Sequence, residues 1–223
     1  MTLDECGGSV GGPIIKNKLF FFGSYERYRG RFGLNFIEAA PSLSLAQAGA
    51  LIPGTATPVN PAIQPFIAGF RSPNAVLIPG ASAASGFDIL QLQASEKTDE
   101  KAYAARFDYQ VNSLNKLYFR FFRDEGNDIS PEGVSGRVVT IRAVPQNMVA
   151  GWQSIIKSDG SLINEFRLGY NGARTRINGS APTVNGLDFS ALTLNISGSV
   201  ANTGIAGQGT SSGISIPGGL VRA

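Results

Sequence analysis

The sequence contains no histidine and a single cysteine, Cys6. Without histidine, Ser-His-Asp and Cys-His catalysis, imidazole acid–base chemistry and histidine-bearing metal sites are excluded. One cysteine forms no internal disulfide and fits no zinc-ligand spacing. We therefore expect that the protein is not an enzyme, that it has no catalytic or metal site, and that it binds no cofactor.

Charge is also scarce, because only 16% of the residues are charged and the formal net charge is +3. The basic residues are scattered rather than gathered in a run, so nucleic acid is not an expected partner. A soluble domain with so little charge would have difficulty covering its surface. A barrel wall needs little charge, since one face of each strand meets lipid.

Neither end of the sequence has the features expected of a complete outer-membrane protein. Asp4 and Glu5 stand where a signal peptide has basic residues, and glycines at 7–12 interrupt any apolar region. Residues 220–223 lack the final aromatic residue that bacterial barrels carry. No run of eighteen apolar residues predicts a membrane helix. We expect both ends to be internal to a longer chain.

Alternation with a period of two residues is the strongest pattern in the sequence. It occurs over residues 18–28, in a hairpin over 103–124 and in a second hairpin over 148–171, where apolar and polar side chains take turns. In the first hairpin Leu117, Phe119 and Phe121 alternate with polar or mixed positions. Such segments are typical of strands with one apolar face.

The connections between these segments are of two kinds. Short polar turns are expected at 16–17, 112–116 and 158–161, and long loops at about 30–100, 125–146 and from 177 onward. Short turns at one end and long loops at the other are typical of a transmembrane barrel with periplasmic turns and extracellular loops. The predicted fold is all-β: an incomplete antiparallel barrel wall of about five or six strands, forming an open curved sheet in the outer membrane.

The domain prediction follows from this pattern. Residues 1–176 form the partial barrel, with the long extracellular loop at about 30–100. Residues 177–223 form a loop rich in Gly, Ser and Asn, of a composition that can be disordered in isolation.

Three tyrosines lie at similar distances from the expected turns. Tyr25, Tyr103 and Tyr170 each fall eight or nine residues from a turn, on the apolar face of the strand. At about 3.3 Å per residue and a tilt near 40°, they lie roughly 20–23 Å above the turns. An aromatic girdle at the edge of the lipid layer is expected at this height; ordinary sheet aromatics are the alternative.

The alternation assigns two sets of side chains to opposite faces. The predicted lumen-facing set has a structural role in bridging strands and the plug: Glu26, Arg106, Asp108, Arg120, Asp124, Glu165 and Arg167. The predicted lipid-facing or girdle set is aromatic: Tyr25, Tyr103, Phe107, Tyr109, Phe119, Phe121, Trp152, Phe166 and Tyr170. If Val111 pairs with Leu117, Asp108 lies opposite Arg120 and forms a cross-strand ion pair.

Four spaced motifs resemble the Oar-like TonB-dependent transporters. They are GGPIIKNKLFFFGSYE at 11–26, ARFDYQ at 105–110, LYFR at 117–120 and NEFRLGYN at 164–171. They occur in the order of that family and touch much of residues 7–172. The resemblance implies a barrel in the cell outer membrane that surrounds a plug domain and draws energy from the TonB complex for uptake. It implies outer-membrane lipid, the plug and the TonB complex as partners.

Two other functions remain open. An outer-membrane barrel used for surface display or adhesion, without transport, would use the long loops as its binding surface. A soluble β-sandwich that binds carbohydrate would need both faces of its strands covered by protein, and Trp152 offers only a small binding platform. The transported substrate cannot be read from the sequence.

Overall fold

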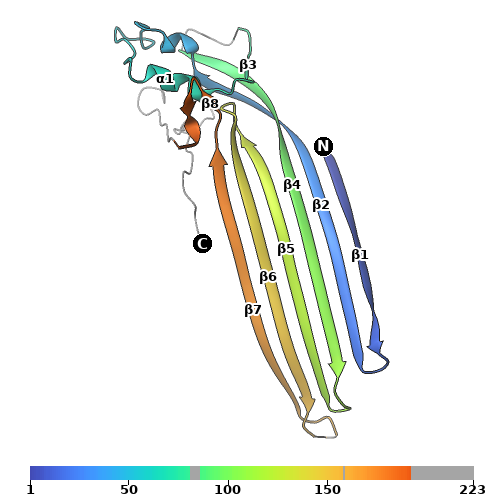
Figure 1. Cartoon of the computed structure of the whole chain (residues 1–223). Coiled ribbons are helices and arrows are strands. Elements are labelled where there is room, and N and C mark those ends of the chain that lie inside the picture. The colour runs from blue at the N-terminus through green and yellow to red at the C-terminus, as the bar shows by residue number, and fades with distance from the viewer. Residues whose placement is uncertain (81–85, 158, 192–223) are drawn as a thin grey trace.

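The computed structural model describes residues 1–80, 86–157 and 159–191 of the chain (Figure 1). Six long strands form one open antiparallel sheet in the order β1-β2-β4-β5-β6-β7. Their bounds are β1 Thr2–Ile15, β2 Leu19–Pro41, β4 Phe87–Gln110, β5 Asn115–Glu132, β6 Arg137–Ile155 and β7 Ile163–Ser180. The short strand β3, Val76–Leu77, pairs with the first part of β4. The predicted all-β open sheet is confirmed.

The strands meet in tight turns at one end, which we call the turn end. Between β1 and β2 the turn passes through Asn17, whose φ of 60° is a left-handed conformation that asparagine tolerates. Between β6 and β7 the N–H of Ser161 donates to the Asp159 carboxylate at 2.9 Å. This hydrogen bond lowers the pKa of Asp159 below its usual value. The opposite end, where 42–86 and 133–136 connect the strands, is the loop end.

The strands are much longer than the period-two pattern predicted. β2 has 23 residues and β4 has 24, whereas about 9–11 residues of a tilted strand cross a bilayer. The loop expected at about 30–100 is therefore confined to 42–86. The long loop expected at 125–146 is wrong, because β5 and β6 continue to a turn at 133–136. In β5 beyond Arg123 both faces are largely polar, so the alternation disappears although the backbone stays extended. In β2 beyond Tyr25 the alternation continues, but the apolar side chains, among them Phe32 and Phe36, move to the opposite face.

β7 likewise runs past the expected end of the barrel at 176 and stops at Ser180. A small hairpin follows, formed by β8 (Thr183–Val184) and β9 (Leu187–Asp188), and then the turn η4 (Phe189–Ala191). The rest of the predicted 177–223 loop, residues 192–223, lies outside the described residues.

The segment 42–80 folds into a small cap at the loop end, beside β8 (Figure 1). It contains the 3-10 turn η1 (Leu43–Ala46), the helix α1 (Gln64–Ile67), the 3-10 turn η2 (Ala68–Phe70) and β3. No helix in the described part of the chain is long and apolar enough to cross a membrane.

Two small apolar clusters and one ion pair hold the cap on the sheet. Ala40, Leu90, Leu92 and Val134 are buried together, with Phe36, Phe70 and Ala75 packed against them. Phe189 is buried in a second cluster, which includes Phe66 and Phe70. The Arg71 guanidinium donates to the carbonyl oxygen of Pro41 and to the Asp88 carboxylate, both at 2.7 Å. The cap is thereby fixed to both β2 and β4.

Candidate functional site

The register of the sheet is continuous across five strands, so side chains that share a face can be followed from strand to strand. Leu19 pairs with Tyr109, Tyr109 with Leu117, Leu117 with Trp152, and Trp152 with Phe166. Because successive residues of a strand point to opposite faces, this row and every second residue from it define one face of the sheet.

All nine aromatic residues predicted to face lipid lie on this face, which we call the aromatic face: Tyr25, Tyr103, Phe107, Tyr109, Phe119, Phe121, Trp152, Phe166 and Tyr170. Leu117, Ala150 and Leu168 fill positions between them. Phe166 is 60% exposed and Leu168 is 67% exposed. An exposed apolar surface of this extent indicates contact with a membrane or another protein.

Toward the turn end the aromatic face carries few polar contacts. The indole N–H of Trp152 donates to Asn115 Oδ1 at 3.1 Å, near the turn end. Tyr25 pairs with Tyr103, while Tyr170 pairs with Met148 and lies two ladder positions nearer the turn end in the register. We call these three residues the tyrosine row. They mark the last aromatic positions of this face before charged residues begin.

The seven charged residues predicted to face the lumen lie together on the opposite face, the polar face: Glu26, Arg106, Asp108, Arg120, Asp124, Glu165 and Arg167. Arg106 and Asp108, two residues apart on β4, form an ion pair at 2.6 Å, and Lys116 lies 3.6 Å from Asp108. Glu165 and Arg167 form a similar pair on β7 at 2.7 Å. The polar face is therefore charged between the tyrosine row and the turn end, where the aromatic face has no charge.

The predicted ion pair between Asp108 and Arg120 is wrong. Asp108 lies opposite Tyr118, and Arg120 lies opposite Arg106, so the expected register was displaced by two residues. The cause is the turn. The Asn112 carboxamide oxygen accepts hydrogen bonds from the Leu114 N–H at 2.9 Å and the Asn115 side chain at 3.0 Å. These two hydrogen bonds to Asn112 tighten the turn and let β5 begin at Asn115.

Beyond the tyrosine row, charge of opposite sign collects on the two faces. The cations on the aromatic face are Arg27, Arg29, Arg31, Lys97, Lys101, Arg123, Arg142, Arg174 and Arg176, and its carboxylates are Asp4, Asp99 and Glu125. On the polar face, the charged residues of the same stretch are mainly carboxylates, among them Glu26, Glu96, Glu100, Asp124 and Asp128.

Sequence reasoning missed this separation of charge. The arginines are scattered along the chain, and the structure brings them to one face. A signal was present: Arg27, Arg29 and Arg31 continue the parity of Tyr25, as Arg174 and Arg176 continue that of Tyr170. No group of three or more His, Cys, Asp or Glu side chains within the described ranges is arranged to hold a metal ion.

Comparison with known proteins agrees with the two-faced sheet. The sequence matches the profile of the outer membrane beta barrel domain over residues 1–221. The chain belongs to this family. It is an outer-membrane protein, and the open sheet is a stretch of barrel wall. No curated protein and no solved structure gives a significant match.

Proposed function

We propose that the chain is a wall segment of a TonB-dependent transporter, which imports a ligand through the outer membrane by energised uptake. The aromatic face meets lipid and the polar face lines the lumen. The turn end lies in the periplasm and the loop end outside the cell. The segment itself carries out no catalysis and binds no cofactor or nucleic acid. Its partners are lipid, the plug domain and, through the plug, the TonB complex.

The position of charge carries the assignment of the faces. Arg106, Asp108 and Arg167 lie at heights where the aromatic face shows only apolar side chains. An arginine or lysine turned to lipid near the bilayer centre costs roughly 2–4 kcal/mol. The polar face therefore belongs in the lumen.

The open edges of the sheet favour a large barrel. The outer edges of β1 and β7 have no neighbouring strand among the described residues, and unpaired N–H and C=O groups are costly in lipid. Further strands must cover these edges in the membrane. Plugged transporters close with about 22 strands, so a wall of six strands would be a modest part of the circumference.

The motifs that resemble Oar-like transporters fall on five of the six long strands of this wall. The first covers the end of β1 and the start of β2, and the others lie on β4, β5 and β7. The ion pairs within β4 and β7 are formed between residues two apart. Such local pairs leave the lumen side of each charged group free to contact a plug and to release it.

Surface display or adhesion is the second candidate. It is favoured by the cap, which is a folded structure with its own buried residues, including Ile67 at 6% exposure. However, the sheet residues under the cap, Ala40, Leu90 and Leu92, lie on the polar face. The cap thus covers the mouth of the lumen, which suits a gated channel as well as an adhesin.

Capture by the energy-coupling protein distinguishes the two functions. The full-length protein that contains this wall segment would be extracted from outer membranes in mild detergent and mixed with the purified periplasmic domain of TonB. Transport predicts capture that an excess of the TonB-contacting peptide of a known transporter competes away. Display predicts no capture, together with loss of cell attachment when the cap is deleted. Absence of capture by well-assembled protein would overturn the transport proposal.

A further inference from the structure

Four of the cations beyond the tyrosine row line a hollow on the aromatic face that no part of the proposed transport function requires. It has a volume of about 430 Å³ and lies across β5, β6 and β7. Its charged lining consists of Arg123, Arg142, Arg174 and Arg176. We call it the arginine hollow.

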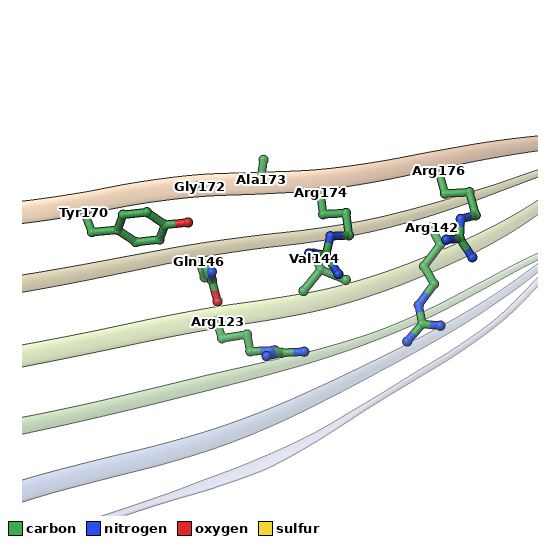
Figure 2. A pocket seen from close by; sticks show the side chains of 9 residues that line it. All are labelled: Arg123, Arg142, Val144, Gln146, Tyr170, Gly172, Ala173, Arg174 and Arg176. Carbon is green, nitrogen blue, oxygen red and sulfur yellow. The ribbon is translucent and has the colours of Figure 1, made fainter. Parts of the chain in front are cut away.

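Figure 2 shows how these side chains lie. The four arginines, Gln146 and Tyr170 project to the same side of the sheet, whereas Ala173 points to the other side. The hydroxyl of Tyr170 is directed along β7 toward Arg174. Gly172 leaves room for this ring, because a Cβ atom there would lie 2.6 Å from the Tyr170 hydroxyl oxygen.

Most of the positive charge in the hollow is not neutralised by the protein. Arg123 pairs with Glu125 at 2.6 Å, and its Nε is buried without a hydrogen-bond partner. Within the described residues, Arg142, Arg174 and Arg176 have no carboxylate within ion-pair distance. Guanidinium groups bind phosphate through paired, charge-assisted hydrogen bonds.

The hollow adjoins a second one that is apolar. This apolar hollow lies nearer the turn end, has a volume of about 380 Å³, and is lined by residues that include Phe119, Trp152, Phe166 and Leu168. Leu168 and Tyr170 are successive outward residues of β7, so the two hollows are neighbours on one strand. A molecule with phosphate groups at one end and acyl chains at the other fits this order of charge and apolar surface.

We propose that the arginine hollow binds the phosphorylated headgroup of lipid A in the outer leaflet, with its acyl chains along the apolar hollow. The site rests on the outward orientation of the aromatic face and is independent of transport. The tyrosine row places the arginines just above the hydrocarbon layer, where a lipid phosphate lies. Clustered Lys and Arg at a membrane surface contribute to anionic lipid binding in this way.

The test uses protein purified from outer membranes in detergent, stripped of lipid and mixed with vesicles that contain lipid A. The variant is Arg174→Gln/Arg176→Gln. The matched control is Arg167→Gln, which removes one cation from the same strand on the polar face. Lipid A affinity should fall about fivefold for each hollow arginine removed, and so about twenty-five-fold for the pair. The control should bind as the unmodified protein does.

Further arms identify the ligand chemistry and guard against misfolding. Arg174→Lys/Arg176→Lys should retain most of the affinity. Should the double glutamine variant fail to assemble, Arg176→Gln alone tests the same fivefold loss. Equal binding of lipid A lacking its phosphates would overturn the proposal, as would full displacement by equimolar inorganic phosphate. An equal loss in Arg167→Gln, or no loss in the hollow variants, would also overturn it.

Discussion

Tyr25 on β2 and Tyr103 on β4 are ladder partners, and their ring centroids lie 5.3 Å apart at an interplanar angle of 47°. This tilted arrangement is one that aromatic rings favour. The contact joins the longest strand pair of the sheet at the height where apolar side chains give way to arginines. It therefore marks the boundary on which the membrane placement depends.

The first prediction concerns the face assigned to lipid. Phe107 lies on the aromatic face between Tyr103 and Tyr109, and Phe107→Arg would place a charge in the hydrocarbon layer. We expect a cost of roughly 2–4 kcal/mol and a marked fall in assembled protein. The matched control is Phe20→Arg on the polar face, where Phe20 is the ladder partner of Asp108. Outer-membrane abundance of the two variants is the measurement, and normal assembly of Phe107→Arg would reverse the faces.

The second prediction concerns a close approach between β5 and β6. Gly151 is the ladder partner of Tyr118, whose ring covers it so closely that a Cβ atom would lie 2.2 Å from the ring. Gly151→Ala must displace this ring, which also packs against the Arg106 guanidinium at 5.4 Å. We expect a loss of about 1 kcal/mol. The urea midpoint of the detergent-solubilised protein should fall, whereas Gly33→Ala, with open space around it, should not lower it.

Sequence reasoning could predict the open antiparallel sheet because lipid and lumen impose different chemistry on successive residues. This contrast separates Phe107 and Phe119 from Arg106 and Arg120 in the sequence pattern. The register of the hairpin at 111–114 could not be predicted, since it depends on hydrogen bonds accepted by one side chain, Asn112. A difference of two residues preserves the faces and changes every partner.

The extent of the strands was underestimated for a physical reason. Past Tyr25 the strand β2 continues to Pro41, and apolar and polar residues still alternate, but the apolar side chains change face. Phe32 and Phe36 lie on the polar face, so the single apolar face that marks the membrane-crossing part ends at Tyr25. The arginine hollow was missed for a related reason. Arg123, Arg142 and Arg174 come from three strands, and their proximity depends on the register, which the sequence pattern left open.

The third prediction tests which end of the sheet lies outside the cell. Thr57 is exposed in the cap, and Ser161 is exposed in the turn between β6 and β7. Each would be changed to cysteine in a Cys6→Ser background, because Cys6 is itself exposed. In intact cells a membrane-impermeant maleimide should label Thr57→Cys and spare Ser161→Cys. Labelling of both positions after the outer membrane is opened controls for accessibility, and the reverse pattern in intact cells would invert the orientation.

The fourth prediction concerns the attachment of the cap to the sheet. The Glu38 carboxylate on β2 accepts a hydrogen bond from the Val134 N–H at 2.9 Å, in the turn between β5 and β6. Gly133 precedes this N–H with a φ of 69°, and a Cβ atom there would lie 2.6 Å from Glu38 Oε2. The turn is therefore built closely around the carboxylate.

Removing the acceptor should loosen the cluster of Val134 with Leu90 and Leu92, and the cap with it. A hydrogen bond to a charged group contributes roughly 1.5–3 kcal/mol. Glu38→Ala should therefore raise the population of the open cap by at least about tenfold. Arg71 supplies the measurement, because its chain is protected while the cap is closed and its side chain is only 15% exposed. Trypsin added to intact cells should cut after Arg71 faster in Glu38→Ala than in Glu96→Ala, a carboxylate on the same face that lies outside the cap contacts. Equal cleavage rates in Glu38→Ala and Glu96→Ala would show that the apolar clusters hold the cap without Glu38. In that case Glu38→Gln, which keeps an acceptor oxygen, should be cut at the same rate as both.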